Sequence, residues 1–201
     1  MKDLAKSDLD LIAESSYREM MTGLRTLITK LYRRNPDAWR ATGKPDRQYA
    51  VKRVFRARRV PDSVELHGRR ASEAVRLAFD EHYTGDRVLA FVAGLTAMVQ
   101  DAYGGRDEFY LFDKIDPRKL YNSARNIEIA AWLLGSKRNV RDQPFLLADS
   151  RPGETRNLSF ERLFGRLIGT RDTLAEFVAD RTDRTIRHVI QRIAGAIFLP
   201  I

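Results

Sequence analysis

The chain has 201 residues, of which 43% are hydrophobic and 31% are charged, a composition typical of a folded domain rather than a disordered segment. It contains 36 Lys and Arg against 27 Asp and Glu, and the net charge of +9 favours anionic partners without specifying any chemistry. Cysteine is absent, which excludes disulfides, thiolate metal sites and a thiol nucleophile from these residues.

The chain is predicted to begin with a long amphipathic helix. Ser7 is a suitable N-cap for this helix, and Asn35-Pro36 is a suitable end. Apolar residues recur at helical spacing along one face, and they are Leu9, Ile12, Met20, Leu24, Leu27 and Leu31. We expect a short helix around Trp39 and then a basic helix over 47–58.

Three further helices are predicted in the middle of the chain. The first covers Ser72–His82, and the second covers Arg87–Tyr103. The second is apolar on most faces, so we expect it to be the central buried helix. Its longest apolar run, Val88–Val99, has about 12 residues and is too short to span a bilayer. Asp116-Pro117 is a strong start signal for a helix that reaches about Leu134.

In the last quarter of the chain, the sequence predicts an irregular segment at the surface over 138–157, followed by two helices. These helices start near Ser159 and near Asp183. Alternating strand patterns and internal repeats are absent from the sequence. We therefore predict an all-α fold, a single-domain irregular helical bundle of about six to eight helices over 1–201. The expected core includes Leu24, Leu27, Leu31, Leu89, Val92, Leu95, Ile127, Leu163, Leu167, Val178 and Ile190.

The positive charge is concentrated in residues 25–70. This window holds 14 Lys and Arg against four acids and carries +10, so the other 155 residues sum to −1. One interpretation is a solvated face on which arginine stems cover apolar surface. The other is a functional anion-binding face, because this much charge exceeds what pairing within the window neutralises.

No catalytic motif is present. The three histidines, His67, His82 and His188, are far apart, and no HExxH or Glu-x-x-His spacing places two metal ligands on one helical face. We therefore expect a non-enzymatic protein with no catalytic residue, no metal site and no cofactor.

Two pairs of residues allow both structural and functional interpretations. Arg125 and Glu128 lie one turn apart on a predicted helix and are expected to form a partly buried ion pair. Gly165 and Gly169 would let another helix approach closely, either a neighbour in the bundle or a helix of a second chain.

Three stretches of the sequence carry a resemblance to a known group of proteins. They are Lys2–Pro36 (KDLAKSDLDLIAESSYREMMTGLRTLITKLYRRNP), Lys119–Leu134 (KLYNSARNIEIAAWLL) and Asn157–Ile201 (NLSFERLFGRLIGTRDTLAEFVADRTDRTIRHVIQRIAGAIFLPI), about half of the chain. In them the chain resembles a group of uncharacterised lipoproteins from proteobacteria. The resemblance implies a location in the cell envelope and assigns no activity. Precursors in that group carry a lipidated cysteine shortly before the counterpart of Lys2, so a removed leader would explain the absence of cysteine.

We therefore expect a periplasmic, lipid-anchored helical domain with a binding or scaffold role. Its predicted anion-binding residues are Lys52, Arg53, Arg56, Arg58 and Arg59. The expected partner is an anionic membrane surface or an envelope polymer, and a protein partner is a further option. The alternative is a cytoplasmic nucleic-acid-binding protein that uses the Arg-rich segment 47–59.

Overall fold

The structure is a computed structural model that describes residues 7–55, 64–108, 115–148, 157–181 and 197–201. Within these residues the protein is an all-α helical bundle, as the sequence predicts. Four long helices form its body: α1 (Asp8–Arg34), α5 (Arg87–Ala102), α6 (Pro117–Ser136) and α7 (Ser159–Arg181). The shorter elements are α2 (Asp37–Arg40), α3 (Arg47–Phe55), a 3₁₀ turn at Val64–Leu66 and α4 (Ala71–Leu77).

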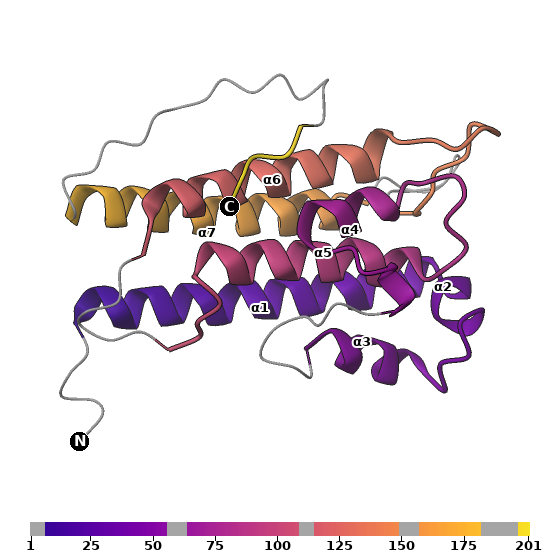
Figure 1. The fold of residues 1–201 in the computed structure, drawn as a ribbon, viewed down its shortest axis with the longest axis horizontal. Helices are drawn as coiled ribbons and strands as arrows, with labels where there is room; N and C mark the ends of the chain where they lie inside the picture. The colour runs from indigo at the N-terminus through magenta and orange to yellow at the C-terminus, as the bar shows by residue number, and fades with distance from the viewer. Residues whose placement is uncertain (1–6, 56–63, 109–114, 149–156, 182–196) are drawn as a thin grey trace.

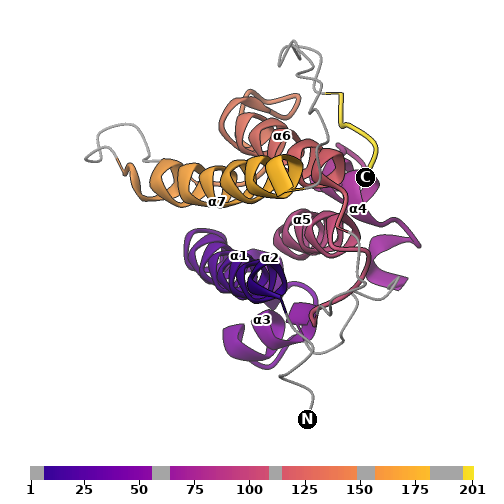
Figure 2. The ribbon, with the colours of Figure 1, turned by 90° about the vertical axis from the view of Figure 1, so that its left-hand side faces the viewer.

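The long helices lie side by side, and each runs antiparallel to the one before it (Figure 1). α5 is central and contacts α1 and α6, while α7 packs against both α6 and α1 (Figure 2). α4 covers α5, and α3 lies against the outside of α1 and α5. Within the basic segment 25–70, residues 25–55 therefore comprise the C-terminal part of α1, then α2 and α3.

Helix α1 begins and ends at the residues that the sequence indicates. Ser7 and Asp10 form a capping box, in which the Ser7 hydroxyl accepts from the Asp10 amide and the Asp10 carboxylate accepts from the Ser7 amide. At the other end Asn35 accepts from the Leu147 amide at 2.8 Å and donates to the Leu147 carbonyl at 3.0 Å. These two bonds tie the end of α1 to the segment after α6.

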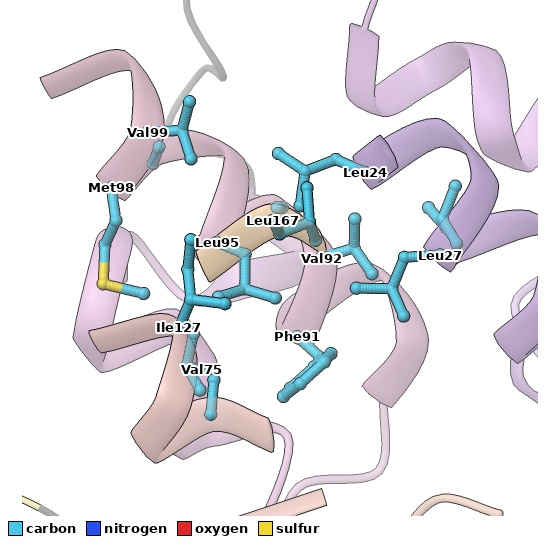
Figure 3. Close-up of a cluster of buried hydrophobic side chains, with 14 of the residues drawn as sticks. Leu24, Leu27, Val75, Phe91, Val92, Leu95, Met98, Val99, Ile127 and Leu167 are labelled. Carbon is cyan, nitrogen blue, oxygen red and sulfur yellow. The ribbon is translucent and has the colours of Figure 1, made fainter. Parts of the chain in front are cut away.

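The central position of α5 follows from its composition. Every residue of α5 except Arg87 and Asp101 is buried, which confirms the prediction of a central helix. Figure 3 shows its apolar side chains between those of α1, α4, α6 and α7. Nine of the eleven predicted core residues are buried; Leu163 is half-buried, and Ile190 lies outside the described residues.

Two glycines allow helices to approach closely in this core. A Cβ at Gly94 would lie 2.6 Å from the Ala71 carbonyl oxygen and 2.7 Å from the Val75 nitrogen, so α4 and α5 touch backbone to backbone. A Cβ at Gly23 would lie 2.6 Å from a methyl group of Leu167, where α1 meets α7. The helices can approach this closely at both contacts because glycine has no side chain.

The structure corrects two details of the predicted helices. Ile12 was expected on the buried face of α1, but it is 41% exposed because Ala13 and Met20 occupy the core-facing positions there. The helix predicted to reach His82 ends at Leu77. Its end is explained by Arg87, whose guanidinium donates to the carbonyls of Ala78, Asp80 and Tyr83 at 2.6–2.9 Å and satisfies them outside a helix.

The last described residues, 197–201, lie against α6. Asn126 is fully buried and exchanges two hydrogen bonds with the backbone of Leu199, at 2.6 and 2.9 Å. Asn122 donates to the Pro200 carbonyl at 2.9 Å, and the Arg76 guanidinium lies 5.4 Å from the Phe198 ring centre. The first described helix, α1, and the last described residues, which bind α6, therefore lie on opposite sides of the bundle (Figure 2).

Truncation of Leu167 tests the packing of α7 against α1. We expect Leu167→Ala to lower the free energy of unfolding by about 2–5 kcal/mol, because it opens a cavity beside Gly23 that rigid helices cannot fill. Leu11→Ala is the matched control, since Leu11 is 52% exposed in α1. Urea unfolding measures both, and a loss below about 1 kcal/mol for Leu167→Ala would contradict the assigned packing.

Candidate functional site

The cations of the segment 25–70 separate into a buried group and a surface group. Lys44 is the buried member: its side chain is 2% exposed, and its Nζ lies 2.8 Å from the Asp86 carboxylate. The Lys44 ammonium also donates to the Thr42 hydroxyl at 2.9 Å, and it lies 3.8 Å from the Glu65 carboxylate. A charge at this depth requires such partners, because water does not solvate it there.

Asp86 connects this lysine to two helices. Its Oδ2 accepts from the Tyr32 hydroxyl of α1 at 2.8 Å as well as from Lys44, and its Oδ1 accepts from the Leu89 amide, as the N-cap of α5. Burial, together with the Asp86 charge, raises the pKa of the Tyr32 phenol above its ordinary value. We call Tyr32, Lys44 and Asp86 the buried triad.

Three other cations of the segment have acidic partners. Arg53 donates to Glu65 at 2.8 Å, and this hydrogen bond raises the pKa of the Arg53 guanidinium. Arg70 forms a bidentate salt bridge with Asp101, in which Nη1 and Nη2 donate to the two carboxylate oxygens at 2.5 and 2.8 Å. Arg69 lies 3.8 Å from Asp80.

Three of the acids that take up this charge lie outside the window. They are Asp80, Asp86 and Asp101, which the fold brings next to Arg69, Lys44 and Arg70. The count of +10 in sequence therefore overstates the charge that residues 25–70 present at the surface.

A second group of cations lies at the surface of α1, α2 and α3, where none of its members forms an ion pair with a described residue. Arg47 is half-buried and the other members are exposed. We call this group the basic corner, and it consists of Arg25, Arg33, Arg40, Arg47 and Lys52.

The structure places the predicted anion-binding residues in different settings. Lys52 is exposed on α3 and belongs to the basic corner, whereas the side chain of Arg53 is 33% exposed and bound to Glu65. Arg56, Arg58 and Arg59 lie outside the described residues. Sequence reasoning missed Arg25, Arg33 and Arg40 as companions of Lys52, because the helices that carry them are separated in sequence from α3.

Aromatic rings lie among these cations. The Arg40 guanidinium is 5.3 Å from the centre of the Trp39 ring, and that of Arg25 is 4.8 Å from the Phe55 ring. Trp39 and Phe55 also pack against the core, while Tyr49 is 38% exposed on α3. The basic corner is thus a mixed cationic and aromatic surface.

The predicted pair of Arg125 and Glu128 exists and has a third member. Arg125 lies 3.2 Å from Glu128 and 2.5 Å from Asp172 of α7, and its guanidinium lies 5.0 Å from the centre of the Tyr121 ring. The cluster joins α6 to α7, which supports the structural interpretation of this pair.

Arg171 is a buried cation that sequence reasoning missed. It is fully buried, its guanidinium lies 4.4 Å from the Tyr103 ring centre, and its Nη2 donates to the Val99 carbonyl at 3.1 Å. Its Nε and Nη1 have no hydrogen-bond partner among the described residues, and burial lowers the pKa of the guanidinium. The available signal was its position between Leu167 and Leu174 on the apolar stripe of α7.

A groove of about 480 Å³ separates the N-terminal half of α1 from the C-terminal half of α7. Ile12, Leu174 and Phe177 supply apolar surface, and four hydroxyl groups line the rest, those of Ser15, Ser16, Thr170 and Thr173. The charged lining residue, Glu19, is engaged by Arg166 at 2.8 Å. A Cβ at Gly169 would meet nothing within 4 Å, so no described residue uses that glycine for close approach.

The described residues contain no group of three or more His, Cys, Asp or Glu that is able to hold a metal ion. Within the same residues, no helix is both long enough and apolar enough to cross a membrane. Comparison with known proteins found no matching family model, curated protein or solved structure. The fold itself therefore defines the class, an all-α helical bundle.

The Arg125 cluster generates a prediction about pH. Burial raises the pKa of the Glu128 carboxyl, Arg125 opposes this effect and Asp172 adds to it. The folded state therefore binds the Glu128 proton more tightly than the unfolded state does. The free energy of unfolding consequently falls as rising pH ionises the carboxyl. We expect Glu128→Gln to match the parent near about pH 4 and to be the more stable protein near about pH 7.

Urea unfolding at the two pH values measures this difference. Glu176→Gln, at an exposed position of α7, is the control for the loss of one negative charge. A Glu128→Gln variant that is less stable than the parent at neutral pH would show that the ion pair with Arg125 outweighs burial.

Proposed function

We propose that the protein is a non-enzymatic binding or scaffold domain of the cell envelope, whose basic corner binds an anionic partner. The observation that carries the proposal is a set of five cations on α1, α2 and α3, none of which forms an ion pair with a described acid. Asp86 and Asp101 pair with other cations of the same segment, whereas these five have no such partner among the described residues. Their combined charge attracts phosphate or carboxylate groups over roughly a Debye length.

The support for an envelope location is the resemblance to proteobacterial lipoproteins. A lipid anchor holds a protein at the membrane surface, and a basic surface adds attraction to that membrane where the headgroups are anionic. The lipid anchor and the basic corner are therefore complementary parts of one proposal.

The proposed anchor makes a prediction about the product of the native gene. Cells that express this gene in the presence of a clickable palmitate analogue should yield a labelled protein in the membrane fraction, since lipoproteins are acylated at their first mature residue. An unlabelled protein that remains in the cytoplasm would contradict the envelope location and favour the alternative below.

The alternative is a nucleic-acid-binding protein that uses residues 47–59. The observation in its favour is the mixture of cations and aromatic rings at the basic corner, because single-stranded nucleic acids bind to surfaces that combine these groups.

Charge removal tests the basic corner. We expect the combined change of Arg33, Arg40, Arg47 and Lys52 to Gln to weaken binding to phosphatidylglycerol-containing vesicles at least about tenfold, since each cation contributes about 1 kcal/mol at such a surface. The free energy of unfolding should change by less than about 1 kcal/mol, because none of the four cations forms an ion pair with a described residue and surface charges add little stability. Arg53 is left intact because it pairs with Glu65.

A matched variant controls for net charge. The change of Arg118, Lys119, Lys137 and Arg141 to Gln also removes four positive charges, here from exposed positions of α6 and the turn after it. Vesicle co-sedimentation at low and high salt measures all three proteins, and a variant with Arg56, Arg58 and Arg59 changed to Gln tests the predicted residues beyond α3. Equal loss in the α6 variant would show that total charge, and not the basic corner, is responsible for binding.

A further inference from the structure

The basic corner has the composition of a surface that meets a lipid bilayer. Lys and Arg stems carry their charge outward while their methylenes cover apolar surface, and Trp and Tyr favour the level of the lipid headgroups. At this corner Arg40 lies beside Trp39, and the exposed Tyr49 shares α3 with Lys52. We propose, building on the proposed function, that the partner of the basic corner is an anionic lipid bilayer, with Trp39 and Tyr49 at headgroup depth.

The form of α3 supports this partner. α3 buries only Ala50 and Val54, which face α1 and α5, and it presents Arg47, Tyr49 and Lys52 on its other sides. It lies at the periphery of the bundle, away from α6 and α7 (Figure 2). A short amphipathic helix with cations on its polar side can therefore contact a flat surface without moving the four long helices.

The aromatic rings favour lipid over nucleic acid. Stacking of bases requires free ring faces. The Trp39 and Phe55 rings pack against the core, and the guanidinium groups of Arg40 and Arg25 lie 5.3 and 4.8 Å from their centres. These rings therefore offer edges and adjacent positive charge, which suit headgroups, rather than an open platform for bases.

The positions of the two tryptophans allow a direct test. Trp39 lies on α2 at the basic corner, whereas Trp132 is 38% exposed on α6, a helix on the opposite side of α5 from α3 (Figure 2). Trp132→Phe leaves Trp39 as the reporter, and Trp39→Phe leaves Trp132 as the matched control. Both variants are mixed with vesicles of equal parts phosphatidylcholine and phosphatidylglycerol, with and without brominated acyl chains.

We expect the emission of Trp39 to shift to shorter wavelength and to be quenched by the brominated lipid, while the emission of Trp132 stays unchanged. Vesicles of phosphatidylcholine alone should produce neither effect, since the attraction requires anionic headgroups. Trp132→Phe retains the whole basic corner, so its result does not depend on whether Trp39→Phe folds.

Three other results would overturn the inference and separate it from the proposed function. Vesicle binding without preferential quenching of Trp39 would refute the bilayer contact but leave the basic corner as an anion-binding surface. Binding to single-stranded RNA in place of vesicles would refute it in favour of the nucleic-acid alternative. Binding to neither would refute both the inference and the proposed function.

Discussion

A carboxylate buried at the start of α5 holds together the part of the molecule that presents the basic corner. Asp86 accepts from Tyr32 of α1, from Lys44 ahead of α3 and from the first turn of its own helix, each at 2.8 Å. A buried charge is tolerated only while its partners stay in place, so these bonds fix three separate segments relative to one another. Glu65 extends the network, because it lies 3.8 Å from Lys44 and also binds Arg53 on α3. Glu65 therefore connects the buried triad to α3, which also packs against α1 and α5 through Ala50 and Val54.

The same basic segment thus has two physical roles. Some of its cations are taken into the fold by acids that are distant in sequence, and these contacts organise the edge of the bundle. The remaining cations lie on the elements that those contacts hold in position, close to Trp39, Tyr49 and Phe55. The structural and functional interpretations of the charge are therefore complementary, since the buried cations support the surface that the exposed ones form.

The sequence is most informative where the signals are local. Ser7 and Asp116 start helices as predicted, and the uniformly apolar α5 is the central helix. Prediction fails where tertiary contacts decide the outcome. Arg87 binds carbonyls just beyond α4, where a longer helix was predicted, and Ile12 is exposed because its neighbours face the core. The buried triad belongs to this second class, because nothing around Lys44 in sequence indicates that Asp86 will meet it. The density of charge in the sequence was enough to predict Lys52 as an anion-binding residue. The cations on α1 and α2 could be grouped with it only once the structure was known.

The stability of a protein that lacks the Lys44 ammonium is the most direct test of this account. Lys44→Met keeps most of the side-chain volume but leaves Asp86 buried without its cation. We expect a loss of about 3 kcal/mol or more in the free energy of unfolding, measured by urea at neutral pH. Lys52→Met is the matched control at an exposed position of α3, and it should change stability by less than about 0.5 kcal/mol. Similar, small effects of the two substitutions would contradict the claim that the buried triad holds this edge of the bundle together.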